Sequence, residues 1–115
     1  MTEPLTAEET VAAIAMLTPD RLEAYVEIGI VMPLQAGDGP RFSSIDRARL
    51  ELVCELAETH ELADEALALV MSLVDQLHAA RADLQALGRA VDVQPDEVRE
   101  SVLSAWRAAR GGLAD

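Results

Sequence analysis

Few residues in this chain have the types and spacing that catalysis or metal binding requires. Cys54, Glu58 and His60 come nearest to a metal-ligand set, but a spacing of six puts the cysteine and the histidine on different faces of a helix. The other histidine, His78, is far away in sequence, and the chain has no HExxH motif, cysteine pair or glycine-rich phosphate loop. No serine or aspartate has the partners of a nucleophilic site. The sequence therefore predicts neither an enzyme nor a metal or cofactor site.

Carboxylates are the more informative group, and the segment from Thr18 to Gly29 carries three of them. Thr18 supplies a capping hydroxyl, Pro19 a favoured first helical residue and Gly29 a left-handed stop, so the segment predicts a short helix. The apolar face of this helix consists of Leu22, Tyr25 and Val26.

The three carboxylates share the opposite face of this helix. Asp20, Glu23 and Glu27 fall at i, i+3 and i+7, and such a cluster of like charges costs stability. We therefore predict a docking face for a positively charged partner, with the apolar residues Ile30 and Val31 at its rim. A second acidic strip on the next helix is interpreted as solvated surface and kept as the alternative interface: Glu51, Glu55 and Glu58.

The remaining N-terminal half predicts two more helices and a small hairpin. Thr6 and Glu9 form a capping-box pattern that opens a helix to about Met16, with Val11, Ile14 and Ala15 facing inward. A short strand at 30–33 and a turn at 37–40 lead into Arg41-Phe42-Ser43. A helix capped at Ser43 then runs to about Thr59, and Cys54 within it should be a small buried thiol. A broad apolar arc of this helix consists of Ile45, Ala48, Leu52, Val53 and Leu56.

The C-terminal half predicts one long helix and one further helix. From about Asp64 to Val91, apolar residues alternate steps of three and four, as in a coiled coil: Val70, Leu73, Leu77, Ala80, Leu84, Leu87 and Val91. This seam either pairs with a second chain or packs on the neighbouring helices of one monomer, and we favour the homodimer. The last helix runs from Pro95 to about Arg110, ends at Gly111-Gly112 and should bury Trp106 against the long helix.

Composition and charge restrict the classes of function. The 115 residues have a net charge of −12, and all nine basic residues are arginine. Residues 1–50 hold eight acids against four arginines, so binding to a phosphate backbone is disfavoured. A single cysteine, the absence of a basic leader and the lack of an apolar run of about 18 residues predict a cytoplasmic protein without a membrane span.

The segment from Arg21 to Pro33, followed by Arg41-Phe42-Ser43, resembles the winged helix-turn-helix of MerR-type regulators. Together with the helical run at 61–77, it is more similar to chaperone modulators of the CbpM type, which are small MerR-like proteins that bind and inhibit a DnaJ-type co-chaperone. The likeness covers roughly residues 6–90. It implies a mainly α-helical fold, with a winged helix-turn-helix-like head and a small β-wing over 1–60. A helical dimerisation region would follow over 61–115.

The resemblance also implies a partner and an alternative. The partner would be the J-domain of a DnaJ-type co-chaperone, whose action with Hsp70 the protein would inhibit. The alternative is a MerR-like transcription regulator that binds DNA. Glu23 and Glu27 stand near the places where MerR-type relatives hold phosphates with arginines, and this departure favours the modulator.

Overall fold

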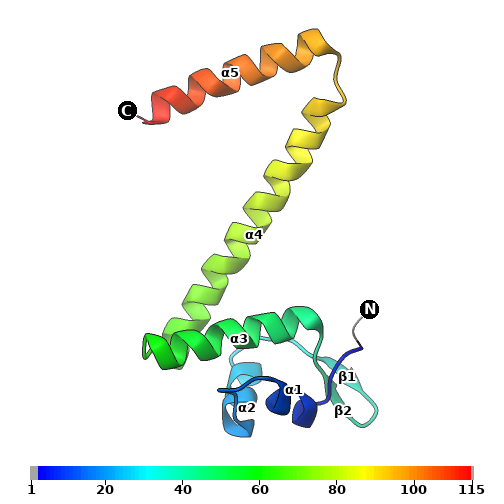
Figure 1. The fold of residues 1–115 in the computed structure, drawn as a ribbon, viewed down its shortest axis with the longest axis vertical. Helices are drawn as coiled ribbons and strands as arrows, with labels where there is room; N and C mark the ends of the chain where they lie inside the picture. The colour runs from blue at the N-terminus through cyan, green and yellow to red at the C-terminus, as the bar shows by residue number, and fades with distance from the viewer. Residues whose placement is uncertain (1–2, 115) are drawn as a thin grey trace. The chain divides into compact units, whose positions relative to one another are not determined.

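A computed structural model describes residues 3–114 and is mainly helical, with one small antiparallel sheet (Figure 1). Three residues lie outside the described part of the chain: Met1, Thr2 and Asp115. The first two belong to the segment predicted to lack a leader, and Asp115 is the end of the predicted dimerisation region. Among residues 3–114, no helix is both long and apolar enough to cross a membrane. The elements are α1 (Ala7–Ala13), α2 (Pro19–Glu27), β1 (Leu34–Ala36), β2 (Gly39–Arg41), α3 (Ser44–Thr59), α4 (Asp64–Asp92) and α5 (Asp96–Ala114).

The chain divides into two compact units, Met1–Asp75 and Gln76–Asp115. The first unit, called the head below, contains α1 to α3, the β1–β2 hairpin and the beginning of α4. The second unit, called the tail, contains the rest of α4 and α5. The head extends beyond residue 60 because Leu67 and Met71 of α4 are buried in its core.

The three helices of the head begin where their capping residues predict. Thr6 and Glu9 form a reciprocal capping box, with backbone-to-side-chain hydrogen bonds of 2.9 and 3.1 Å. Ser43 and Asp46 do the same for α3, at 3.0 and 3.1 Å. Thr18 caps α2 by accepting a backbone N–H at 3.1 Å. The predicted starts of α1, α2 and α3 are therefore confirmed, although α1 ends at Ala13 rather than near Met16.

The end of α2 determines where the following residues lie. Gly29 adopts φ +83°, and the backbone N–H groups of Gly29 and Ile30 donate to the carbonyls of Val26 (3.1 Å) and Tyr25 (2.9 Å). This is the Schellman arrangement, in which the residue after the glycine turns back toward the helix. The chain reverses at Gly29, so Ile30 and Val31 enter the core.

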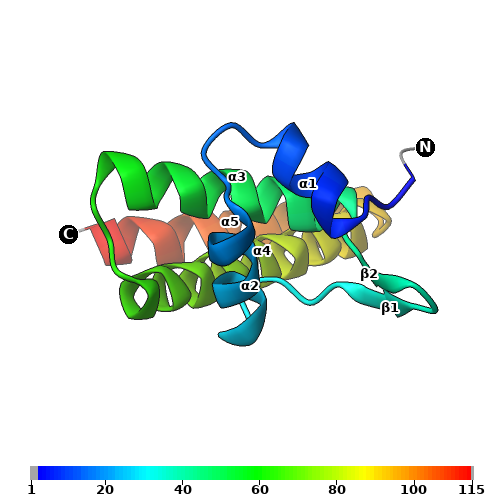
Figure 2. The same cartoon turned by 90° about the horizontal axis from the view of Figure 1, so that it is seen from below.

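The hairpin lies later in the chain than predicted. β1 begins at Leu34 rather than at Ile30, and Leu34 pairs with Arg41 across a turn of Gly37 and Asp38. Figure 2 shows β1 and β2 side by side. The strand predicted at 30–33 is wrong because the Ile30 N–H caps α2 and Pro33 has no N–H for a ladder. The Arg41 guanidinium lies 2.7 Å from Asp38, and this ion pair holds the turn.

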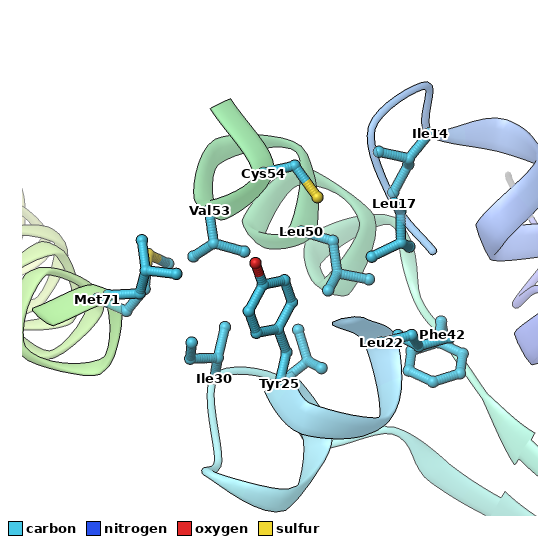
Figure 3. Packing of buried hydrophobic residues seen from close by; sticks show 12 residues of the cluster. Ile14, Leu17, Leu22, Tyr25, Ile30, Phe42, Leu50, Val53, Cys54 and Met71 are labelled. Atoms are coloured by element: carbon cyan, nitrogen blue, oxygen red, sulfur yellow. The ribbon is translucent and has the colours of Figure 1, made fainter. Parts of the chain in front are cut away.

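The core of the head surrounds the aromatic ring of Tyr25. Figure 3 shows the ring among Leu50, Val53 and Ile30, which come from α3 and from the segment after α2. The apolar arc predicted for α3 is partly wrong, since Ile45 is 72% exposed and Ala48 is also exposed. Ala15 is exposed as well, while Cys54 is buried as predicted. The buried apolar residues are Ile14, Leu17, Leu22, Tyr25, Ile30, Val31, Phe42, Leu50, Val53, Cys54, Leu67 and Met71.

The tail has no comparable core. Of residues 76–112, none is buried, and only Val91, Arg99 and Leu103 are partly covered. The predicted burial of Trp106 is wrong, because its side chain is 49% exposed in the single chain. α5 also continues through Gly111 and Gly112, which were expected to end it; neither glycine has a positive φ, so no left-handed stop forms there.

Stability of the head should decline at alkaline pH. Burial raises the pKa of the Tyr25 phenol and of the Cys54 thiol, so the folded protein keeps both groups neutral. Unfolding exposes them at their ordinary pKa values, about 8.5 for the thiol and about 10 for the phenol, so the free energy of unfolding should fall as pH rises above about 8.5. Because the chain has no lysine, no other side chain loses a proton between about pH 8 and 11.

Urea unfolding followed by circular dichroism between about pH 7.5 and 10.5 would measure this decline. The matched control is Cys54→Ala with Tyr25→Phe, whose free energy of unfolding should stay level over the same range. A level profile for the unmutated protein would contradict the prediction.

Candidate functional site

The head carries a groove between α1, α2 and β2, with a volume of about 750 Å³. Its floor is apolar, and three glutamates stand along its edge. We call it the acid-rimmed groove. Its lining residues are Ala7, Glu8, Val11, Pro19, Leu22, Glu23, Val26, Glu27, Pro40 and Phe42.

A backbone contact between residues distant in sequence builds this groove. The backbones of Leu5 and Phe42 exchange hydrogen bonds of 2.9 and 2.8 Å, which hold the start of α1 beside the end of β2. Leu22 is buried in the core below, so α2 presents Val26 and its glutamates along the groove. The contact between Leu5 and Phe42 does not follow from helix periodicity, and therefore sequence reasoning missed Glu8 and Pro40.

The rim carboxylates have no positive partner. Glu8, Glu23 and Glu27 are exposed, and none of them forms an ion pair or a side-chain hydrogen bond with another described residue. The arginines of the head are all engaged with other acids. These pairs are Arg21–Glu58, Arg41–Asp38, Arg47–Glu51 and Arg49–Asp75. The negative charge of the rim is therefore uncompensated within residues 3–75.

The structure corrects part of the predicted docking face. Ile30 and Val31 are each only 2% exposed, so they cannot line an exposed surface. Asp20 is exposed but borders a different hollow, beside Asp64 and Tyr25, and does not line the groove. Of the five residues predicted for partner binding, Glu23 and Glu27 line the acid-rimmed groove.

The second acidic strip is largely neutralised. Glu51 lies 3.2 Å from Arg47 and Glu58 lies 2.8 Å from Arg21, while Glu55 has no ion pair among the described residues. Surface pairs of this kind contribute little stability, but they occupy the carboxylates. The strip is therefore a weaker candidate for binding a basic partner than the rim of the groove.

Arg49 holds the α2 and α4 sides of the head together, and sequence reasoning did not single it out. Its Nε donates to the backbone carbonyl of Ile30 at 2.7 Å, and its guanidinium also pairs with Asp75 of α4. The sequence around Arg49 gives no signal of this role, since both partners lie far away along the chain.

The residues considered as metal ligands are not brought together in the described part of the chain. Cys54 is buried while His60 is exposed, and residues 3–114 contain no group of three histidine, cysteine or acidic side chains placed to hold a metal ion. The groove offers shape, apolar surface and negative charge, which are the means of recognising a partner.

The residues of the α4 seam remain uncovered in the single chain. Leu73, Leu77, Leu84 and Leu87 are exposed, and Val70 and Val91 are partly covered. Apolar side chains at this spacing suit a second helix.

Searches found no match for the chain among protein-family models, curated proteins or solved structures. The candidate site therefore rests on the geometry and charge of its own residues.

The uncompensated rim should cost stability. Glu23 and Glu27 lie one helical turn apart, and a pair of like charges at this spacing destabilises a helix by about 0.2–0.5 kcal/mol. Replacing both by glutamine should raise the free energy of unfolding by about that amount, and the gain should shrink in 1 M salt. Denaturant unfolding at low and high salt would measure it.

The matched control is Glu51→Gln with Glu58→Gln, which removes two ion pairs and should leave stability unchanged or lower it. A loss of stability in the Glu23 and Glu27 variant would show that these carboxylates are compensated after all.

Proposed function

We propose that the protein is a cytoplasmic chaperone modulator, with no catalytic activity of its own. It binds the J-domain of a DnaJ-type co-chaperone and inhibits that domain's action with Hsp70. The acid-rimmed groove is the docking site, and the observation that carries the proposal is its three uncompensated glutamates beside an apolar floor.

The chemistry of the groove suits a basic amphipathic helix. Val11, Val26 and Phe42 provide an apolar floor for the apolar face of such a helix, as in other helix-in-groove complexes. Glu8, Glu23 and Glu27 provide charges for its basic flank. J-domains present a basic helix, and a modulator seated on that helix would keep Hsp70 away from it.

The order of elements in the head supports the resemblance to the MerR-like head. α2, the β1–β2 hairpin and α3 follow in the order of the recognition helix, the wing and the next helix. The head nevertheless carries a net charge of −11, from 15 acids and four arginines in residues 1–75. A DNA duplex would meet repulsion at this surface, which favours a basic protein as the partner.

We also propose that the protein is a homodimer paired through the exposed seam of α4. A mostly exposed leucine stripe on a helix of 29 residues is costly in water, and pairing with a second copy would cover it.

Charge reversal of the rim tests the docking proposal. Glu23→Arg with Glu27→Arg should abolish J-domain binding through repulsion of the basic helix, and the fold should persist because both side chains are exposed on α2. Calorimetric titration of the J-domain against both proteins measures the effect, with circular dichroism as the folding control. Binding by the unmutated protein should weaken as salt rises.

Glu55→Arg with Glu65→Arg is the matched control, because it changes the net charge equally at exposed acids away from the groove. This control should bind the J-domain almost normally. Unchanged binding by the Glu23 and Glu27 variant, or loss of binding in the control alone, would overturn the groove as the site. Sub-micromolar binding of the unmutated protein to duplex DNA at physiological salt would favour the transcription regulator instead.

A charge in the α4 seam tests the dimer. Leu84→Glu or Leu77→Glu should place an unpaired carboxylate in the apolar interface and dissociate the dimer into monomers. Ala82→Glu, on the opposite side of α4, should leave the mass unchanged. Light scattering coupled to gel filtration gives the mass, and a monomeric unmutated protein would refute the proposed pairing.

A further inference from the structure

The tail carries an apolar groove that its own residues do not fill. The groove has a volume of about 390 Å³ and lies between the second half of α4 and α5, which diverge from the turn after Asp92 (Figure 1). Leu84, Leu87 and Val91 line one side, and Val102, Leu103 and Trp106 line the other.

We propose that this groove receives α5 of a second copy of the chain, and that the two α5 helices lie antiparallel. The inference rests on the homodimer proposed above and is independent of J-domain binding. It adds α5 and Trp106 to an interface so far assigned to α4 alone.

The tail has no buried residue among 76–112, so its apolar side chains need a second surface to pack against. The exposed side chains of α5 include Val98, Val102 and Trp106, at steps of four along one side of the helix. A helix of 19 residues that contains Gly111 and Gly112 is marginal in water without tertiary packing. The apolar side of α5 therefore requires a partner surface.

The distribution of charge favours a second copy over a different protein. Residues 76–115 carry five arginines and six acids, a net charge of −1, whereas the head carries −11. Two nearly neutral tails can meet without strong repulsion, while a basic partner would be drawn to the head. Leu84 and Leu87 also belong to the α4 seam, so the groove is continuous with the interface proposed there.

The order of charges along α5 sets the direction of pairing. Its first two turns hold Asp96, Glu97 and Glu100 with one arginine, Arg99, which pairs with Asp96 at 2.6 Å and leaves the two glutamates without an ion pair among the described residues. Arginines occupy its end, at Arg107 and Arg110. An antiparallel pair centred near Val102 and Leu103 puts the basic end of each copy beside the acidic end of the other. A parallel pair would put like charges together. The antiparallel pair is also two-fold symmetric, and it alone brings opposite charges together.

Trp106 reports on this interface directly. It is the only tryptophan of the chain and is half exposed, with the Arg110 guanidinium 4.9 Å from the centre of its ring. In the pairing proposed here it lies beside Val98 of the other copy. Its emission should therefore be blue-shifted in the dimer and should move to longer wavelength on dilution.

The test uses two charge-reversed full-length proteins. One carries Arg107→Glu with Arg110→Glu, and the other carries Glu97→Arg with Glu100→Arg, which leaves the Asp96–Arg99 pair intact. Each alone should dimerise about tenfold more weakly or worse, because both symmetric contacts become repulsive. An equimolar mixture should recover the dimer, since the reversed ends then face each other with opposite charge. Sedimentation equilibrium and Trp106 emission provide the two measurements, with circular dichroism as the helicity control.

The possible failures are distinguishable. Two weakened variants whose mixture does not recover would overturn the antiparallel pairing. Variants that dimerise normally, with Trp106 emission independent of dilution, would show that α5 lies outside the interface while the α4 dimer stands. A monomeric unmutated protein would overturn both proposals for the dimer. Loss of J-domain binding in the Glu23 and Glu27 variant has no bearing on any of these outcomes.

Discussion

The organisation of the head depends on how the chain leaves α2. Gly29 allows the reversal, and the next residue has both backbone groups satisfied, its N–H by Tyr25 and its carbonyl by Arg49. The same arginine pairs with Asp75, so one side chain connects the end of α2 to α3 and α4. A buried backbone segment requires such partners, and without them the Ile30 carbonyl would be buried at a cost of about 1–3 kcal/mol.

The four arginines of the head all take part in structural contacts. Arg49 binds the Ile30 carbonyl and Asp75, while Arg41 pairs with Asp38 in the hairpin turn. Arg21 and Arg47 pair with acids of α3. The chain has no lysine, so no lysine or unpaired arginine in residues 3–75 remains for the glutamates on the groove. The rim is negative because the head has only four arginines, and each of them pairs with an acid elsewhere.

The two units of the chain present different kinds of surface. The head combines a packed core with strong negative charge, which suits a basic partner reached through electrostatic attraction. The tail combines near neutrality with exposed leucine, valine and tryptophan, which suits association through apolar contact. The proposed functions largely follow this division, with the J-domain assigned to the groove of the head and the second copy to the tail and the seam of α4.

The sequence determined the features that depend on neighbouring residues. Capping hydroxyls at Thr6, Thr18 and Ser43, and the glycine at 29, set the helix limits of the head, because these residues act on backbone groups within a few positions. The step pattern of α4 and the acids on α2 follow from helical periodicity for the same reason.

Tertiary structure decided which of these surfaces meet. Ile30 and Val31 have the composition of a strand, but the reversal at Gly29 buries them, and the partners of Leu5 and Arg49 lie far along the chain. Periodicity also suggested that α4 would bury Trp106, yet in one chain α5 leaves an open groove beside it. Burial and ion pairing depend on residues distant in sequence, and so the groove in the head and the uncovered surface of the tail emerged only in three dimensions.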